Sequence, residues 1–373
     1  MCIMSFTASG HSLYTEVYMQ KNLEVTLAQL VSFPSVPSDA QACKDIINYV
    51  QKELASLGLH ITTDLNRSNP WLIATTKKTM QPTTLLAAHL DVVPAPKELF
   101  ALQVNDGTLV GRGVYDMKFA AACYIEFAKT HKDILETLDI GFMFTTDEEV
   151  GGPSVIDILS QGWKPGRVLI PDGGDNWHIE ERAKGFYGIE VTINGKTAHG
   201  SRPWEGNNAI HALNTVINAL RADFPDKTPG EATLAVTRIS GGTAVNQIPD
   251  QATMHLDFRS FDDAELVRFL AALESHIKPF GGTSVVLQSG APVAFDKTAP
   301  IVQDFIAAIQ QTTGNNAVYS DSYGGTDARH FAQAGIPTIV AEPNGGGRHA
   351  PDEWVQANDL EKFYQLLTTW LIK

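Results

Sequence analysis

The sequence predicts an α/β protein with a mostly parallel sheet, interrupted by an inserted α+β unit. Short apolar strands alternate with amphipathic helices from about residue 23 to residue 183, and the alternation resumes near residue 293. The segment between them follows a different order of elements. At 373 residues the chain exceeds the size at which single hydrophobic cores stop growing. We therefore expect residues 1–183 and 293–373 to form one domain and residues 184–292 another.

The first part of the larger domain contains patterns of both helical and strand type. Apolar residues recurring every three to four positions predict helices at 23–32, 39–58, 116–132 and 155–161. Short apolar runs predict buried strands at 71–75, 84–89, 139–146 and 168–171. Strands that alternate with helices form a largely parallel sheet, and polar residues follow several of these strands. A site is therefore expected beyond the carboxyl edge of this sheet.

The inserted segment has the order β-α-β-β-α-β. Its strands are expected at 186–193, 233–239, 253–258 and 283–288, and its helices at 208–224 and 264–278. This order matches the split βαβ arrangement, in a unit of normal domain size. The α/β pattern then resumes with a helix at 301–313, a strand at 338–341 and a last helix from residue 360.

Composition restricts the classes of partner. The formal net charge is -14 at pH 7, which argues against nucleic-acid or anionic-membrane binding, because both need a basic face. The cysteines Cys2, Cys43 and Cys123 are too few and too scattered for a disulfide framework or a zinc ribbon. No apolar run reaches the length of a membrane span, and no basic start followed by an apolar block is found near the beginning. We expect a cytoplasmic protein.

Five short segments each carry side chains that bind metal ions. They contain His89, Asp116, the pair Glu148 and Glu149, Asp172, and His349. Together they provide two imidazoles, a carboxylate for each of two metals, one carboxylate that can bridge, and a spare glutamate. A paired-zinc hydrolase requires this inventory. Asp172 precedes the inserted unit and His349 follows it, so the two share a site only if both flanks fold as one domain.

The first two segments each allow more than one interpretation. His89 and Asp91 stand two residues apart at a strand end, so both side chains can face one side. Asp91 can hold the second ring nitrogen of a metal-bound His89 or can brace a neighbouring group. Asp116 follows a glycine-rich turn, where it can bridge two metals or simply cap the following helix.

The remaining segments are equally open when taken singly. Gly151 and Gly152 permit a turn that aims both Glu148 and Glu149 at one cleft. One glutamate can then bind metal while the other accepts a proton from water on the metal; the alternative is a solvated acidic loop. Asp172 can be a ligand or can begin an Asx turn, and His349, in a glycine-rich loop, can be a ligand or simply exposed.

The inserted unit carries a second set of polar residues. If this unit covers the cleft, His199 and Asn246 could stabilise an oxyanion. Arg259 could then grip a substrate carboxylate in bidentate fashion. The alternative is that all three are ordinary polar residues of the surface.

With these residues assembled, the chain resembles the di-zinc family of succinyl-diaminopimelate desuccinylase, acetylornithine deacetylase, aminoacylase and glutamate carboxypeptidase. The likeness extends from about residue 25 to the end. It implies two zinc ions per subunit, replaceable by cobalt or manganese, with Asp116 bridging them and the full ligand set His89, Asp116, Glu149, Asp172 and His349. It also implies that Glu148 is the general base and that Asp91 supports the site.

The same resemblance implies the roles of the two domains. The larger one would be a phosphorylase/hydrolase-like α/β/α sandwich, and the inserted one a ferredoxin-like lid and dimerisation domain. His199 would assist catalysis, often across a dimer, and the substrate-contact segments would include Asn246, Arg259, Gly325 and Thr326. We expect a homodimer that hydrolyses an amide bond of a small N-acyl amino acid or peptide bearing a carboxylate.

The chain departs from the family pattern in two places. Phe119 and Ala120 follow Lys118 where the family commonly has glycine, and the segment 95–110 is short and lacks a tryptophan. These departures bear on the packing of a helix and on one wall of the substrate pocket. Two other functions remain open: a di-zinc aminopeptidase or dipeptidase, and a non-catalytic dimeric protein that binds a small molecule.

Overall fold

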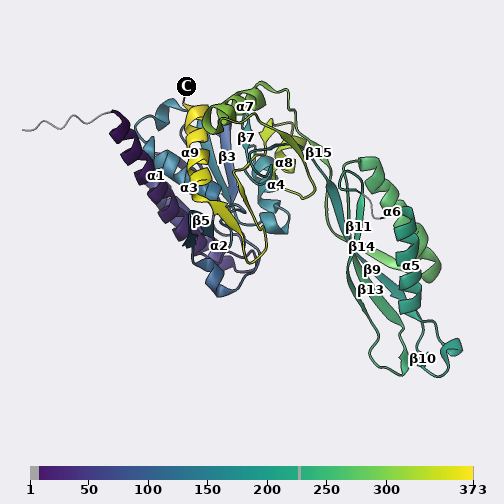
Figure 1. Ribbon diagram of the computed structural model, residues 1–373. Helices are drawn as coiled ribbons and strands as arrows, with labels where there is room; N and C mark the ends of the chain where they lie inside the picture. Colours follow the sequence, from purple (N-terminus) through teal and green to yellow (C-terminus); the bar gives the residue numbers. More distant parts are fainter. Residues whose placement is uncertain (1–7, 226–227, 373) are drawn as a thin grey trace, which may run out of the picture. The chain divides into compact units, whose positions relative to one another are not determined.

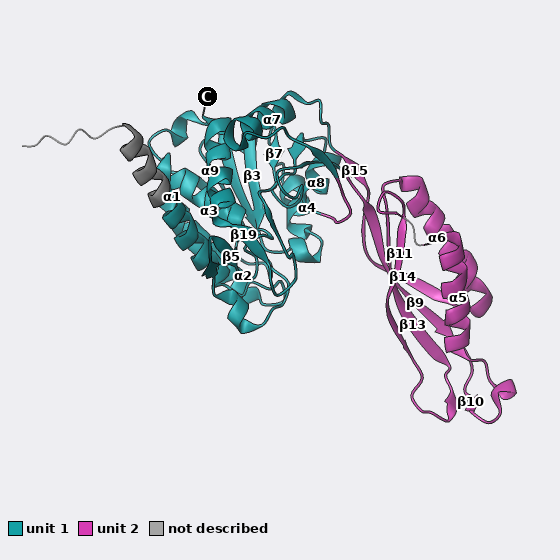
Figure 2. Ribbon diagram, in the orientation of Figure 1, with its two compact units in different colours: residues 1–181, 295–320, 326–373 teal, residues 182–294, 321–325 magenta. Residues whose placement is uncertain are grey.

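The chain forms two compact units, which Figure 2 distinguishes by colour. The structure, a computed structural model, describes residues 8–225 and 228–372, with residues 8–18 described by their backbone alone. Unit 1 comprises residues 1–181, 295–320 and 326–373, and unit 2 comprises residues 182–294 and 321–325. Unit 1 is thus built from segments on both sides of unit 2. Residues 321–325, which we expected in the larger domain, belong to unit 2.

A six-stranded sheet in the order β1-β2-β6-β3-β7-β17 organises unit 1 (Figure 1). Strand β3 runs parallel to β6 and β7, and β7 runs parallel to β17. Strand β2 is antiparallel to β1 and β6. The sheet is therefore parallel at its centre and mixed in orientation overall. Its strands are β1 (His60–Asp64), β2 (Trp71–Thr75), β3 (Thr84–His89), β6 (Ile140–Thr145), β7 (Val168–Leu169) and β17 (Thr338–Ile339).

The helices of unit 1 form two groups. Helices α1, α3, α7 and α9 are linked by mutual contacts, and α4 contacts α8; in Figure 1 the sheet lies between these groups. Helix α2 packs on β2 and α3 packs on β3. The bounds are α1 (Ala8–Val31), α2 (Ala40–Ala55), α3 (Lys118–Thr130), α4 (Pro153–Ser160), α7 (Pro300–Thr313), α8 (Ala328–Gln333) and α9 (Ala357–Leu371).

Phe119, the departure from the family pattern in α3, is accommodated in the core. The side chain is fully buried. Its ring lies 5.3 Å from the ring of Phe363 in α9, nearly perpendicular to it, and 6.1 Å from the ring of Tyr115. Such aromatic pairs add stability beyond the burial of area. The larger side chain therefore fills the contact between α3 and α9.

A four-stranded sheet in the order β18-β19-β5-β4 joins two distant parts of unit 1. Strand β19 pairs antiparallel with both β5 and β18, and the bounds are β4 (Gln103–Asn105), β5 (Thr108–Val110), β18 (Gly345–Gly346) and β19 (Trp354–Gln356). This pairing brings the segment that carries Asp116 beside the segment that carries His349. The sequence does not predict these strands, because two or three residues are too few to show a period.

Unit 2 contains a four-stranded antiparallel sheet in the order β11-β13-β9-β14. Helices α5 and α6 pack against it and bury the inward residues of the alternating strands. The elements follow the predicted order: β9 (Gly185–Asn194), α5 (Ala209–Asp223), β11 (Thr233–Gly241), β13 (Gln251–Ser260), α6 (Asp263–Ile277) and β14 (Thr283–Gly290). A small pair, β10 (Ala198–His199) with β12 (Gln247–Ile248), completes the unit.

Short elements complete the described chain. A three-stranded sheet in the order β15-β8-β16 is formed by β8 (Ile179–Ala183), β15 (Val293–Ala294) and β16 (Tyr319–Ser322). Single-turn 3₁₀ helices lie at Lys97–Phe100, Leu135–Thr137, Glu148–Val150, Pro203–Glu205 and Lys278–Phe280. Cys43 and Cys123 are buried and free, while Cys2 lies outside the described residues. Within the described part of the chain, every helix is too short or too polar to traverse a lipid bilayer.

Candidate metal centre

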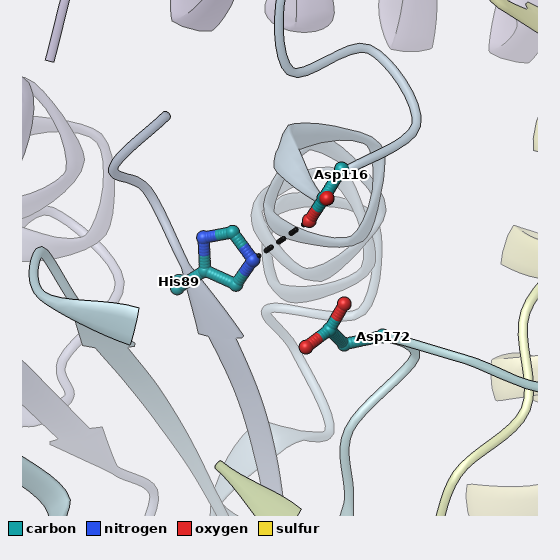
Figure 3. A group of neighbouring side chains, drawn as sticks. All are labelled: His89, Asp116 and Asp172. Atoms are coloured by element: carbon teal, nitrogen blue, oxygen red, sulfur yellow. Dashed lines mark hydrogen bonds and ion pairs between the residues drawn. The ribbon is translucent and has the colours of Figure 1, made fainter. Parts of the chain in front are cut away.

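His89 ends strand β3 at the carboxyl edge of the parallel strands. Its ring is buried, with Nδ1 3.0 Å from the backbone oxygen of Asp91 and Nε2 3.0 Å from Oδ1 of Asp116. Figure 3 shows this ring directed toward Asp116, with Asp172 close by. Burial alone would lower the pKa of His89, but hydrogen bonds with Asp116 and Asp91 raise it well above its usual range. The carbonyl of Asp91 thus holds the ring in the orientation that a metal ligand requires.

The carboxylate of Asp91 contacts both His89 and the glutamate turn, and its Oδ1 lies 3.6 Å from Nδ1 of His89. Its Oδ1 and Oδ2 accept hydrogen bonds from the backbone amides of Glu148 and Glu149, at 3.3 and 3.0 Å. Both the backbone oxygen and the carboxylate of Asp91 therefore lie beside the second ring nitrogen of His89, and the carboxylate also braces the neighbouring turn. Asp91 is fully buried, so it fixes the turn that presents both glutamates.

Asp116 lies in the loop before α3 and contacts both histidines. Its Oδ1 is 3.0 Å from Nε2 of His89, and its Oδ2 is 3.3 Å from Nε2 of His349. Burial alone would raise the pKa of Asp116, but hydrogen bonds from His349 and His89 hold it well below its usual range. Helix α3 begins after Met117 without a side-chain cap, so the capping interpretation of Asp116 is wrong.

Asp172 follows β7 and is buried beside the first two residues. Its Oδ1 accepts a hydrogen bond from Nη1 of Arg348 at 2.9 Å, and Nη2 of Arg348 pairs with the buried carboxylate of Glu342. Burial raises the pKa of Asp172, and the negative charge of Asp116 raises it further. Arg348 therefore orients Asp172 through its Oδ1.

Glu148 and Glu149 leave the end of β6 in a single 3₁₀ turn. Gly151 and Gly152 follow with φ values of 101° and 64°, which glycine adopts readily and which end this turn. Oε2 of Glu149 lies 3.1 Å from Nε2 of His349. Glu148 instead lines a cavity together with His89, Asp172 and Thr145. Burial, and then the charge of Asp172, raise the pKa of Glu148 well above its usual range.

The ligand-type side chains form two groups that share Asp116. One group is His89, Asp116 and Asp172, and the other is Asp116, Glu149 and His349; within each, the ligand atoms lie within 4.8 Å of one another. Imidazole nitrogens and carboxylate oxygens are donors that zinc and related divalent ions accept. The donor set therefore fits a pair of cations with a shared carboxylate. The structure brings together every predicted metal-ligand residue.

The predicted site residues of unit 2 have local partners. His199 is exposed, with Nδ1 2.8 Å from Oγ of Ser201, and the amide of Gly200 donates to the backbone oxygen of Asn246 at 2.7 Å. Arg259 donates to both oxygens of Asp257, at 2.8 and 3.0 Å, and to the backbone oxygen of Tyr323 at 3.0 Å. A substrate carboxylate would therefore compete with Asp257 for this guanidinium.

The two predicted contacts in the glycine-rich loop fall in different units. Gly325 belongs to unit 2, whereas Thr326 belongs to unit 1. Thr326 is buried and its hydroxyl hydrogen-bonds to Asp172. The side chain of Thr326 thus supports Asp172, one of the ligand-type residues, in addition to any substrate contact.

The sequence did not point to several residues that surround the cluster. Glu353 accepts hydrogen bonds in the loop before Asp116, Arg348 orients Asp172, and Asp327 lines the cavity with Glu148. Burial raises the pKa of Asp327 to about 8. One sequence feature could have indicated these residues: charged residues are concentrated around His349 and after the Gly324-Gly325 pair. These residues follow no helical or strand periodicity.

Comparison with known proteins identifies a family model and several relatives that are similar to this chain. The model of peptidase family M20/M25/M40 matches residues 85–373. A putative succinyl-diaminopimelate desuccinylase of Mycobacterium tuberculosis is 28% identical over 361 residues, covering 94% of this chain and 97% of the relative. A succinyl-diaminopimelate desuccinylase of Marinobacter nauticus is 27% identical over 376 residues, covering 92% and 96%.

Solved structures share the fold. A tripeptidase from Staphylococcus aureus has a TM-score of 0.79 at 20% identity, covering 94% of this chain and 97% of the other. An M20 family metallo-carboxypeptidase from Sulfolobus solfataricus has a TM-score of 0.77 at 18% identity, covering 94% and 98%. At these identities the similarity concerns the mixed α/β fold.

Proposed function

The chain belongs to peptidase family M20/M25/M40 and is a hydrolase of amide bonds, and from this premise we propose a two-metal mechanism acting on a small N-acyl amino acid or peptide. The observation that carries the proposal is the pair of donor groups sharing Asp116. Two-metal hydrolases hold their cations about 3.5–4 Å apart, and a carboxylate shared by two donor groups suits that spacing. The relatives named as desuccinylases support an N-acyl substrate.

Two zinc ions per subunit are the proposed cofactors, with cobalt or manganese able to replace them. One ion would be held by His89, Asp116 and Asp172, and the other by Asp116, Glu149 and His349. When bound, the cations polarise the substrate carbonyl, acidify water and offset the negative charge that raises the pKa of Glu148. Side chains of this protein carry out the proton transfers and bind the substrate.

Glu148 is the proposed general base. It lines the cavity beside His89 and Asp172, yet it belongs to neither donor group, so its carboxylate is available to accept a proton from water. It then returns a proton to the leaving nitrogen. Asp91 supports this step by holding the amides of Glu148 and Glu149.

Unit 2 is proposed to supply substrate contacts and a dimer interface. His199 and Asn246 would donate to the developing oxyanion, while Arg259 and Gly325 would bind the substrate carboxylate. Thr326, which belongs to unit 1, is proposed as a further substrate contact. Strand β14 is an edge strand with exposed Val285, Val286 and Leu287, a surface that pairs readily with another chain. We expect a homodimer in the cytoplasm; elution at the monomer mass in gel filtration would count against the dimer.

A substrate panel tests the proposed function. The metal-stripped protein, with and without added zinc, is assayed on N-succinyl and N-acetyl amino acids, dipeptides and tripeptides. We expect zinc-dependent cleavage of substrates with a free carboxylate and little cleavage of their amidated counterparts, because Arg259 would lose its partner. Cleavage of free-amine chromogenic amides alone would favour the aminopeptidase alternative. A protein that binds no zinc and cleaves nothing would favour the binding-protein alternative.

A further inference from the structure

Glu353 accepts four hydrogen bonds through one buried carboxylate. Its side chain is 1% exposed, and its Oε1 accepts from the amides of Tyr115 and Asp116 at 2.9 and 3.0 Å. Its Oε2 accepts from the amide of Gly113 at 3.0 Å and from Nη1 of Arg112 at 2.6 Å. A single side chain just before β19 therefore holds four residues of the loop that presents Asp116.

Arg112 extends this arrangement to the other end of the metal cluster. While its Nη1 pairs with Glu353, its Nη2 donates to the backbone oxygen of His349 at 2.9 Å. The ring of His349 in turn contacts Asp116 and Glu149. Asp116 and His349, far apart in the sequence, are thus both attached to one Arg112–Glu353 pair.

The burial of this pair calls for an explanation other than stability. Taking two charges out of water is costly, and a buried ion pair is often no more stabilising than apolar residues of similar size. The pair, however, hydrogen-bonds to the backbone of two proposed ligands, Asp116 and His349. The φ of His349 is 61°. A fixed backbone presents both side chains in one geometry before any cation arrives.

We propose that Arg112 and Glu353 are positioning residues that preset Asp116 and His349 for metal binding. This inference rests on the proposed function, because it requires a cation at the Asp116, Glu149 and His349 group. It makes that group, in which the pair holds the backbone of both Asp116 and His349, more dependent on the pair than the other group, in which the pair holds only the shared Asp116.

Stepwise zinc titration of the metal-stripped protein against a chromogenic chelator tests the inference. The variant His349→Ala identifies the binding step that belongs to its group. Glu353→Gln should weaken the same step by about 10–100-fold, the usual effect of removing a residue that orients a metal ligand. The other step should change less, and circular dichroism should remain that of the wild type.

Glu126→Gln is the matched control. Glu126 is also a buried carboxylate of unit 1, hydrogen-bonded to Thr26 at 2.6 Å, but it contacts no residue of the cluster. We expect a lower melting temperature with both zinc affinities unchanged. If Glu353→Gln does not fold, Arg112→Lys replaces it, since lysine keeps the charge but cannot reach two acceptors as a fork does.

The outcomes separate the inference from the proposed function. Two zinc ions on the wild type with a selectively weakened step in Glu353→Gln or Arg112→Lys support both. Two ions on the wild type with unaltered affinities in these variants overturn the positioning role alone. Fewer than two ions on the wild type overturn the proposed function, and the inference with it.

Discussion

Three predicted metal ligands of unit 1 and the predicted site residues of unit 2 have opposite surroundings. In unit 1, His89, Asp116 and Asp172 are 2%, 7% and 7% exposed and contact one another or a buried partner. In unit 2, His199 is exposed and its closest partner is the neighbouring Ser201. Arg259 is already paired with Asp257.

This difference separates two kinds of functional group. Charged groups packed together in a buried cluster are held by the fold, so their geometry exists before substrate binds. Groups on a surface with only local partners acquire their function when a substrate or another surface arrives. Variants of unit 1 should therefore damage metal binding and chemistry, whereas variants of unit 2 should act through the substrate complex.

The largest expected effect distinguishes two adjacent glutamates of unit 1. Glu148→Ala should lower turnover by about 10²–10⁴-fold, the range for loss of a general base, while both zinc ions remain bound. Glu149→Ala should lose zinc as well as activity. Metal analysis and steady-state kinetics measure both. Near-normal turnover in Glu148→Ala, or its loss of zinc, would contradict the roles assigned to the pair.

His199 tests whether unit 2 acts on the transition state. Removing one oxyanion donor lowers turnover by about 10²–10³-fold, so we expect His199→Ala to reduce kcat by that amount without loss of zinc. Ser201→Ala is the control, because it removes only the local partner of the ring. If both variants retain wild-type kcat, His199 is a surface residue and the contrast between the units is stronger than proposed.

A pair of arginine variants compares an arginine that contacts a proposed metal ligand with one that contacts an exposed carboxylate of unit 2. Arg348→Met removes the hydrogen bond to Asp172 and should weaken zinc binding by about 10–100-fold, as expected when a ligand loses its orienting partner. Arg182→Met breaks an exposed bidentate pair with Asp321 in unit 2 and should leave zinc binding unchanged. Equal effects of the two variants on zinc affinity would remove the distinction.

The smallest expected effect is the change with pH of the stability that His349 contributes. Its side chain is 54% exposed. In the metal-free protein, hydrogen bonds to Asp116 and Glu149 raise the pKa of His349 to about 10. The stability that this proton contributes is fully present below the unfolded pKa of about 6.5. It is lost as the pH rises toward the folded value.

The melting temperatures of the metal-stripped wild type and of His349→Ala measure this contribution. Solvent screens the half-exposed ring, so we expect the wild type to melt only about 1–3 °C higher at pH 6, with the gap closing toward pH 10. Zinc affinity should change in the opposite sense and rise with pH, because the ion must displace the proton. A gap that widens with pH would contradict the pairing of His349.

The fully buried strands β2 and β3 were predictable from sequence, whereas the shortest strands were not, and helix α1 begins at Ala8 rather than at residue 23. The strands 71–75 and 84–89 were located to the residue, because complete burial leaves a continuous apolar run. Strands β5, β18 and β19 went unnoticed, although they bring Asp116 and His349 together. Residues 321–325 have no compositional mark that would assign them to unit 2.

The ligand types were predictable because each follows a strand end or a glycine turn. The residues that hold these ligands in place were not predictable. In the sequence, Glu353 is simply another acidic residue after Pro351 and Asp352. Its role as a hydrogen-bond acceptor depends on amides that lie 237–240 positions earlier in the chain. Similarly, nothing local indicates that Asp91 accepts hydrogen bonds from the amides of Glu148 and Glu149.

The discontinuity of unit 1 has a consequence for biosynthesis. The ribosome makes His89 and Asp116 early, but the carbonyl that Arg112 must contact comes 237 residues later. Contacts so distant in sequence form slowly. We expect a nascent chain arrested before β18 to hold zinc loosely, and the tight centre to mature only once translation has ended.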